Sequence, residues 1–535
     1  MPGCVDTPVR PEPFDSGLAP VRPERSEAES KGARSRARAW IAAAAAAGVL
    51  VAGAYAALFW SLDALPFQDV PNHLSRAVIL ADLLFHGGAR FGDAFTLRLG
   101  PAPYLLADLS LAGLVERLGP YAAGRLWVVV TWASLPAAVA GYLRLRRYRP
   151  SSIAVATLVA FYLGTDWTFM AGFQAYRLSV AETLLALAAW QRFLESGRPR
   201  WWLAYAACVA LGYLTHLSAV LMTGVAAAVT GLLALGGRRA PFLRVAAGAV
   251  PLLAAVGWEV ASAHGEVAPG VALYDPLLLK LKRTVSLFHR YEYRFDVPLC
   301  ALFAGVLAVL ARGGRSRRRR NERAVAAVAL AAAYLALYDA TPLAHGYVAW
   351  IDCRALPFVP LFLLFAALAL AEESGRSARR AIALALLLAA GNAALLRAHL
   401  VPANQHMREL RALASRVPRG SFFLPVATHR NDHATNPFLH FGSFATIEAD
   451  AITPYLFAGG VTRYLERRGW ERLGPSEFWY QERRGGPFLG WEMTVAGWSF
   501  PYLLWEKPFD PSGGPFVPVR LLAENGAAAL YQVAW

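Results

Sequence analysis

The alternation of apolar and polar residues along the chain predicts a membrane protein with many helical spans. Runs of apolar residues long enough to cross a bilayer as helices alternate with short segments rich in arginine. The segment 201–237 contains no Asp, Glu, Lys or Arg and is too long for one span, so it predicts a helical hairpin that turns near His216. Counting that hairpin as two, the pattern predicts eleven spans, at residues 40–62, 126–143, 151–165, 178–193, 201–237, 245–262, 297–311, 324–338, 355–371 and 381–396.

The basic residues between these runs predict the orientation of the chain. Arginines precede the first span and follow the second, and the densest basic cluster spans residues 312–320. Because positive residues concentrate in cytoplasmic loops, the N-terminus is expected inside the cell. An odd number of spans then leaves the C-terminus outside. The run from Tyr104 to Val115 is apolar but contains Asp108, and it predicts an interfacial or half-inserted helix in a first outer loop at residues 63–125.

Composition divides the chain into three parts. Residues 1–39 are rich in proline and mixed in charge, which predicts a disordered cytoplasmic tail. Residues 40–397 carry the spans and a second outer loop at 263–296. From 398 to 535 charged, aromatic, Gly and Pro residues become frequent, and short strand-like runs lie beside helical ones. The predicted fold class is therefore mainly α, a polytopic helical membrane protein with a small C-terminal α/β domain outside the membrane.

Overall composition supports this class and excludes others. Hydrophobic residues make up 56% of the chain, charged residues only 17%, and the mean hydropathy is +0.36. The net charge of +16 does not indicate nucleic acid, because the basic residues occur in short clusters between apolar runs. The four cysteines, Cys4, Cys208, Cys300 and Cys353, are far apart and predict neither a disulfide framework nor a CxxC metal site.

Candidate chemistry begins directly after the first span, in the segment 67–76. Pro71 suits the first turn of a helix, and helical spacing brings Asp69, Asn72 or His73, and Arg76 toward a common side. A carboxylate there can take a proton from an acceptor hydroxyl as a general base, with His73 and Arg76 holding a phosphate or tuning the carboxylate. The alternative is that Asp69 caps the helix and that the two basic residues reach for lipid headgroups.

Further ionisable residues lie near the predicted outer face. Asp166 and Arg177 flank an irregular segment, and Arg177 forms either an internal ion pair with Glu182 or a substrate contact. His216, at the hairpin turn, is either a packing residue or part of the site. Asp352 and Arg354 either form a local salt bridge, or Arg354 binds a phosphate.

The second outer loop is unusually basic for its side of the membrane, and among its cations are Lys282, Arg283 and Arg290. These residues either bind the phosphate of a lipid-linked donor or anchor the loop to anionic lipid. In the C-terminal part, four residues include enough ligand types for a divalent metal, but their spacing matches no standard zinc pattern: His429, Asp432, His433 and His440. No cofactor is therefore assigned, and a divalent metal stays open.

The arrangement as a whole resembles the GT-C superfamily of integral membrane glycosyltransferases. The resemblance rests on a long first outer loop with an acidic residue just after span one, an amphipathic helix at the membrane, about a dozen spans and an outer C-terminal domain. Local phrases also resemble a group of bacterial membrane proteins of this build: Asp69-Val70-Pro71-Asn72-His73-Leu74-Ser75-Arg76, Gly172-Phe173-Gln174-Ala175-Tyr176, Tyr213-Leu214-Thr215-His216-Leu217 and Asp352-Cys353-Arg354-Ala355-Leu356-Pro357.

The resemblance implies an enzyme of the bacterial plasma membrane and cell envelope. Such an enzyme transfers a sugar from a polyprenyl-phosphate-linked donor to an acceptor at the outer face, and Asp69 is the implied base. The sequence departs from the commonest pattern because no second acidic residue pairs with Asp69 and no Asp-x-Asp follows it. A non-enzymatic alternative is a transporter of lipid-linked intermediates or an envelope assembly factor. A transporter is expected to show paired repeats and central charges, whereas this sequence shows no obvious repeat and its ionisable residues concentrate near the predicted outer face.

Overall fold

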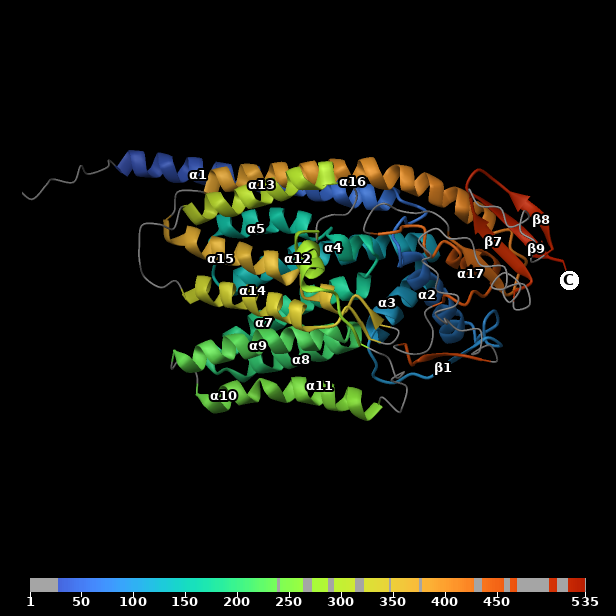
Figure 1. Cartoon of the computed structure of the whole chain (residues 1–535). Helices are drawn as coiled ribbons and strands as arrows, with labels where there is room; N and C mark the ends of the chain where they lie inside the picture. The colour runs from blue at the N-terminus through green and yellow to red at the C-terminus, as the bar shows by residue number, and fades with distance from the viewer. Residues whose placement is uncertain are drawn as a thin grey trace, which may run out of the picture.

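The computed structural model describes residues 27–237, 241–262, 272–286, 293–312, 322–345, 348–374, 378–427, 435–456, 462–468, 500–507 and 518–534. Every predicted span coincides with a helix or a pair of consecutive helices. The bundle helices are α1 (Glu27–Ser61), α4 (Pro120–Leu145), α5 (Pro150–Leu163), α7 (Gln174–Ser196), α8 (Pro199–Thr215), α9 (Ser218–Gly236), α10 (Phe242–Ala247), α11 (Ala249–Ser262), α13 (Tyr293–Arg312), α14 (Glu322–Ala340), α15 (Phe358–Ser374) and α16 (Ala378–Ala414). Figure 1 shows them lying side by side along one axis.

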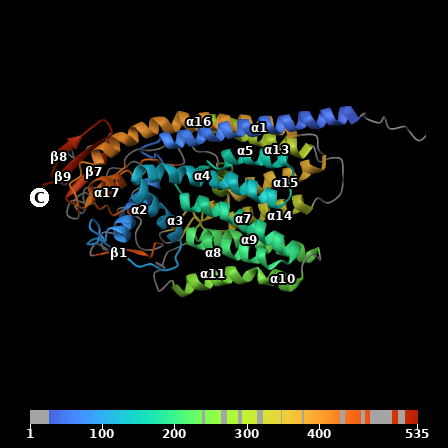
Figure 2. The ribbon, with the colours of Figure 1, turned by 180° about the vertical axis from the view of Figure 1, so that it is seen from behind.

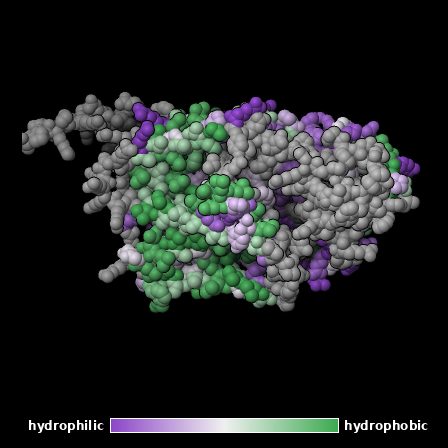
Figure 3. All heavy atoms as spheres, viewed as in Figure 1, coloured by the Kyte–Doolittle hydropathy of each residue, from purple (hydrophilic) through white to green (hydrophobic). Residues whose placement is uncertain are grey.

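The surface of the bundle is apolar. Within the described residues, 6 helical segments are long and apolar enough to cross a membrane by length and composition. They are Pro120–Leu145, Ser218–Gly236, Phe242–Ser262, Glu322–Ala340, Asp352–Glu372 and Ala378–Ala414. Hydrophobic side chains cover the bundle on the face seen in Figure 3, and hydrophilic ones gather toward the opposite end of the molecule. An apolar belt of this kind is stable only in lipid. The chain is therefore a polytopic helical membrane protein, as its apolar runs predict.

Local sequence signals explain where several helices begin and end. Proline occupies the first turn of α4, α5 and α8, where its missing N–H would have had no helical partner in any case. Gly197 ends α7 in a left-handed conformation at φ +66°. Two boundaries differ from the prediction. Helix α1 begins at Glu27, inside the segment predicted as a disordered tail, and α16 runs without interruption from the last span into the C-terminal part, with Pro402 inside it.

Helices from the two ends of the sequence are joined by a buried polar network. The Nδ2 of Asn392 on α16 donates to the hydroxyl groups of Tyr55 on α1 (2.5 Å) and Thr165 after α5 (2.9 Å). Tyr55 in turn donates to the carbonyl oxygen of Ala389 at 3.0 Å. Figure 2 shows α1 and α16 side by side along one edge of the bundle. Because the bilayer core offers no water, these satisfied polar groups specify how α1, α5 and α16 pack.

The end of the bundle at which α4 begins carries the polar elements. Helix α2 (Val70–Phe85) packs against α3 (Leu105–Leu118) and α17 (Ser443–Ala449). Helix α3 is short, as expected for an interfacial helix, and does not belong to the segments long enough to span. Strand β1 (Phe95–Leu97) pairs antiparallel with β6 (Leu465–Arg467), so the first loop and the C-terminal part share a small sheet.

A second sheet completes this end of the molecule. Its strand order is β5-β7-β9-β8, formed by Phe423–Val426, Tyr502–Glu506, Ala528–Val533 and Val519–Glu524. Strand β5 is parallel to β7, whereas β7 and β8 are both antiparallel to β9. Figures 1 and 2 both place this sheet beside α17 and α2, beyond the end of the bundle. The C-terminal part is thus a small α/β unit packed on the first loop.

Three short elements connect bundle helices in the sequence: α6 (Trp167–Met170), α12 (Leu277–Ser286) and a 3₁₀ helix η1 (Asp352–Arg354). A small sheet joins β2 (Ala272–Leu273), β3 (Ala344–His345) and β4 (Val348–Ala349). Helix α12 crosses the direction of the bundle helices in Figure 1. Of these elements, the α6 turn contacts the backbone of Gln68 and Asp69, and α12 approaches η1 through Lys280 and Asp352.

Candidate functional site

Asp69 occupies the N-cap position of α2, but its side chain does not cap the helix. The position is expected, because Pro71 starts the helix and the carbonyl oxygen of Asp69 accepts a hydrogen bond from the backbone N–H of His73 at 3.0 Å. No side-chain capping hydrogen bond forms. The capping role that Asp69 had as an alternative therefore does not account for its carboxylate.

The backbone of Asp69 is held by the turn that follows α6. The N–H groups of Gln68 and Asp69 donate to the carbonyl oxygens of Met170 (3.4 Å) and Ala171 (3.2 Å). Gly172 comes next, at φ +80°, and a Cβ atom added to it would lie 2.7 Å from the nitrogen of Asp69. Only glycine tolerates both this backbone conformation and this close approach. The glycine in the phrase Gly172-Phe173-Gln174 thus allows the α6 turn to pack directly on the Asp69 backbone.

Both polar neighbours of the Asp69 carboxylate meet the same oxygen. Nε2 of Gln68 donates to Oδ1 at 3.4 Å, and Nε2 of His440 lies 3.5 Å from Oδ1. In the described part of the chain, Oδ2 of Asp69 has no hydrogen-bond partner, and the side chain is 12% exposed. Asp69 therefore combines one restrained oxygen with one oxygen that remains available to a bound hydroxyl.

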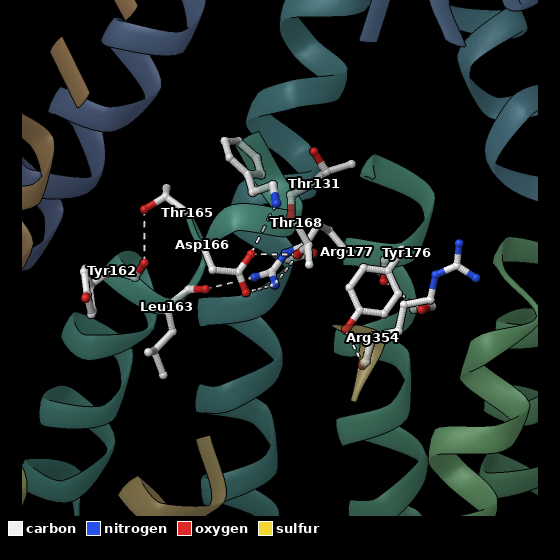
Figure 4. Close-up of polar contacts among 12 residues, drawn as sticks. Thr131, Tyr162, Leu163, Thr165, Asp166, Thr168, Tyr176, Arg177 and Arg354 are labelled. Carbon is white, nitrogen blue, oxygen red and sulfur yellow. Dashed lines mark hydrogen bonds and ion pairs between the residues drawn. The ribbon is translucent and has the colours of Figure 1, made fainter. Parts of the chain in front are cut away.

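Asp166 and Arg177 form a buried ion pair behind this turn, with both side chains 1% exposed. Nη1 of Arg177 lies 2.8 Å from Oδ2 of Asp166, and Nη2 donates to the carbonyl oxygen of Leu163 at 3.1 Å. Figure 4 shows Asp166 also accepting hydrogen bonds at the start of α6, from the Thr168 hydroxyl and a backbone N–H. The two charges satisfy each other and fix the α6 turn. We therefore do not retain them as substrate ligands, and the expected partner Glu182 instead accepts from the Thr215 hydroxyl.

Arg76 is likewise paired inside the protein. Its guanidinium group is 2% exposed and contacts both carboxylate oxygens of Asp108 on α3 at 2.7 Å. Asp108 also accepts a hydrogen bond from the Tyr464 hydroxyl in the C-terminal part. The Arg76 charge is thus neutralised, and it links α2, α3 and the C-terminal unit. In this structure Arg76 thus faces Asp108, whereas the sequence predicted a contact to a substrate phosphate or to lipid headgroups.

His73 and His216 each accept a hydrogen bond on Nδ1. Burial, together with nearby Arg76 and His440, holds the pKa of His73 well below its ordinary value, and its Nδ1 accepts from Nη2 of Arg76 at 2.9 Å. His216 accepts from the Ser218 backbone N–H on Nδ1 at 3.1 Å and contacts the Tyr104 hydroxyl through Nε2 at 2.9 Å.

Because both ring nitrogens of His216 are occupied, the structure favours its packing role. His73 accepts from Arg76, so it helps to hold the Arg76 guanidinium group.

Asp352 and Arg354 do not form the local salt bridge that their spacing suggested. Asp352 is fully buried, accepts from the backbone N–H of Cys353 at 2.7 Å and lies 3.5 Å from Nζ of Lys280 on α12. The guanidinium group of Arg354 has no ion pair or side-chain hydrogen bond within the described residues, and its Nε is buried. Its carbonyl oxygen accepts from the Tyr176 hydroxyl at 2.7 Å.

Figure 4 shows the Arg354 side chain directed away from the Asp166 and Arg177 pair, on the side of Tyr176. The Tyr176 ring in turn packs against His216, with centroids 5.7 Å apart. Arg354 is therefore a cation near the site whose charge no described carboxylate neutralises.

The remaining predicted residues are not tested by the structure. Lys282 and Arg283 belong to α12, but their side chains lie outside the described residues, as does Arg290. His429, Asp432 and His433 are also outside them. Across the described ranges no three His, Cys, Asp or Glu residues are close enough to hold a metal ion. His440 instead contacts Asp69, a role that sequence spacing could not reveal.

Comparison with known proteins gives a structural likeness alone, since neither a protein-family model nor a curated protein matches the sequence. The chain is similar to a solved structure of ArnT from Cupriavidus metallidurans bound to undecaprenyl phosphate, with a TM-score of 0.50 and 13% identity over 90% of this chain and 97% of that one. The structure of the same protein in the apo state gives a TM-score of 0.52 and 12% identity, covering 93% and 98%. At 12% to 13% identity this likeness concerns the fold, which is that of a polytopic helical membrane protein with a small strand region at the C-terminus.

Proposed function

We propose that the protein is a GT-C-type glycosyltransferase that moves a sugar from a polyprenyl-phosphate-linked donor to an acceptor at the outer face of a bacterial plasma membrane. The single observation that carries this proposal is the state of Asp69. Its carboxylate stands at the start of the first-loop helix, makes no cap and keeps Oδ2 available. The similar fold of a protein with undecaprenyl phosphate bound supports the donor class.

In the proposed reaction, the acceptor hydroxyl attacks the anomeric carbon of the sugar. As the new carbon–oxygen bond forms, the bond from that carbon to the phosphate oxygen breaks, and the lipid phosphate leaves with the electron pair. Oδ2 of Asp69 takes the hydroxyl proton, which is general-base catalysis. Arg354 supplies positive charge for the leaving phosphate, because its guanidinium group is not neutralised by a described carboxylate.

Two features of the wider proposal follow the sequence. The basic residues Lys282, Arg283 and Arg290 are proposed as further contacts of the lipid phosphate. The N-terminus is proposed to be cytoplasmic and the C-terminal unit extracytoplasmic, which places Asp69 at the outer face. In support of this arrangement, the first loop and the C-terminal unit pack on each other at one end of the bundle.

The test uses the full-length protein purified in detergent. It is mixed with a panel of undecaprenyl-phosphate-linked hexoses and a membrane lipid extract as the acceptor source, and released undecaprenyl phosphate is measured by mass spectrometry. Asp69→Asn keeps the size of the side chain but cannot take a proton, so turnover should fall about 10² to 10⁴-fold. Since the side chain makes no cap, neither Asp69→Asn nor Asp69→Ala should lower the melting temperature appreciably.

Asp93→Asn is a matched control, because Asp93 is an exposed carboxylate in the same loop. It should leave release unchanged. Full activity of Asp69→Asn would refute the proposed base. Release from none of the donors, together with no binding of undecaprenyl phosphate, would favour the non-enzymatic class of envelope protein instead.

A further inference from the structure

The segment 435–456 of the C-terminal part contacts Asp69 and its neighbours Gln68 and Asn72 at three points. The backbone N–H of Asn436 donates to Oε1 of Gln68 at 3.1 Å. Nε2 of His440 lies 3.5 Å from Oδ1 of Asp69. The carbonyl oxygen of Tyr455 accepts from Nδ2 of Asn72 at 2.6 Å. Residues separated by more than 300 positions in sequence therefore meet around one carboxylate.

Asn72 also determines which nitrogen of His440 carries the hydrogen. The orientation of the Asn72 amide group is fixed, because the Tyr455 carbonyl oxygen can only accept a hydrogen bond and therefore has to face the NH₂ group of Asn72. The same Nδ2 lies 3.4 Å from Nδ1 of His440. An amide nitrogen has no lone pair to offer, so Nδ1 is the acceptor and the ring hydrogen is on Nε2. This nitrogen is the one that lies 3.5 Å from Oδ1 of Asp69.

We propose that His440 is a positioning residue for the proposed reaction, which holds Oδ1 of Asp69 so that Oδ2 faces the acceptor hydroxyl. Gln68 donates to the same oxygen at 3.4 Å and is itself anchored by Asn436, so both donors are held by the C-terminal segment. A carboxylate that is held on one oxygen keeps a single orientation. Misplacing a catalytic base by about 1 Å can lower the reaction rate by about 10²-fold. This inference rests on the proposed function and adds the C-terminal unit to the catalytic site.

The rival explanation is that His440 only fills space. Its side chain is 4% exposed and lies among buried residues, so a smaller residue would also loosen packing. The two roles differ in what restores them. Packing needs volume, whereas positioning needs an N–H at the place of Nε2, which the amide group of glutamine can supply. They also differ in the kinetic constant affected, because an orienting contact acts on kcat rather than on donor binding.

The experiment measures kcat and KM for the undecaprenyl-phosphate hexose that supports release, together with the melting temperature. We expect His440→Leu to lower kcat by about 10²-fold with little change in KM. His440→Gln should recover kcat to within a few-fold of the unmodified protein. His406→Gln is the matched control, because this histidine of the same part of the chain lies beside Glu506 and not beside Asp69. It should leave kcat unchanged.

A second pair of variants tests the tautomer. Asn72→Leu removes the amide donor to Nδ1 of His440, so the ring hydrogen is no longer held on Nε2 and the contact to Asp69 is weakened. It should lower kcat, but much less when made in His440→Gln, where no ring hydrogen has to be placed. This dependence on residue 440 is not expected of a packing defect.

The outcomes separate this inference from the proposed function. If Asp69→Asn abolishes release while His440→Leu keeps kcat, the positioning role is wrong and the base assignment stands. Equal losses in His440→Leu and His440→Gln at unchanged melting temperature also overturn the positioning role. Full activity of Asp69→Asn removes the base itself and with it this inference. If His440→Leu does not fold, the loss of kcat in Asn72→Leu, compared with and without His440→Gln, still decides.

Discussion

Replacing Asp108 by leucine should destabilise the protein strongly, because it leaves the buried Arg76 guanidinium without its counter-charge. Arg76 is 2% exposed and both of its contacts to Asp108 are 2.7 Å, so little water can replace the carboxylate. Removing one partner of a buried ion pair typically costs about 3 to 5 kcal/mol. The variant also removes the acceptor of the Tyr464 hydroxyl, which adds about 1 to 3 kcal/mol if that group stays buried.

The double variant Arg76→Met with Asp108→Leu should recover most of this loss. Apolar residues of similar volume often replace a buried ion pair at little cost, since neither charge then has to leave water. The free energy of unfolding can be measured by titration with SDS in dodecyl maltoside micelles. A coupling energy of about 3 kcal/mol between the two sites is expected for groups in direct contact.

Binding of undecaprenyl phosphate, measured on the same proteins by native mass spectrometry, tests whether Arg76 contacts the phosphate group. If Arg76 is structural, the double variant binds this lipid like the unmodified protein. Loss of lipid binding in a stable double variant would refute the reasoning, because it would show that Arg76 contacts the phosphate in spite of its pairing with Asp108.

Three further outcomes follow from the site. Gly172→Ala should lower the free energy of unfolding by about 1 to 2 kcal/mol for the left-handed backbone alone. It should also lower the release of undecaprenyl phosphate by displacing Asp69, whose nitrogen would be 2.7 Å from the new Cβ, and normal release would contradict this close approach. Arg354→Gln should weaken undecaprenyl phosphate binding about tenfold or more without changing the melting temperature, and unchanged affinity would remove Arg354 from the phosphate site. Since burial beside Arg76 lowers the pKa of His73 below 6.5 in the folded protein, the unfolded chain binds the extra proton first, and stability should fall as the pH drops below about 6.5. His73→Gln should flatten that part of a melting curve series between pH 5 and 8; an equal slope in both proteins would assign it to other groups.

Sequence patterns predict the bundle well because the requirement for span length is local. A segment that crosses the apolar core of the bilayer can be recognised from the length and apolar character of that segment alone. The hairpin at His216 and the short helix α3 were predicted from segment length in the same way. The end of α16 is not local in this sense. Composition predicted that the membrane part ends at 397, yet α16 continues to Ala414, because its polar part packs on the C-terminal unit and Asn404 donates to Asp63 at 2.9 Å.

The site was predictable only in part, for a related reason. Asp69, Gly172 and Arg354 lie in phrases that are recognisable one at a time, but the pairings among charged residues depend on the tertiary fold. Arg177 was expected beside Glu182, its neighbour on one helix, and pairs instead with Asp166 across a turn. His440 was noticed only as a candidate metal ligand, since nothing in the order of residues places it against a carboxylate far earlier in the chain.

Charge pairing gives a physical criterion for choosing substrate ligands among these residues. A cation that already faces a buried carboxylate gains little from a phosphate, because binding would leave that carboxylate unpaired at a cost of several kcal/mol. This criterion excludes Arg76 and Arg177 as phosphate ligands, because each is paired with a buried carboxylate. Lys280 donates to the carbonyl oxygens of Tyr338 and Thr341 at 2.7 and 2.6 Å. Arg354 passes the criterion within the described residues. The same criterion applies to the base, because an aspartate that donor groups approach on one oxygen keeps the other oxygen for the proton. The atoms of this site that have no partner among the described residues therefore define where a lipid-linked sugar and its acceptor would react.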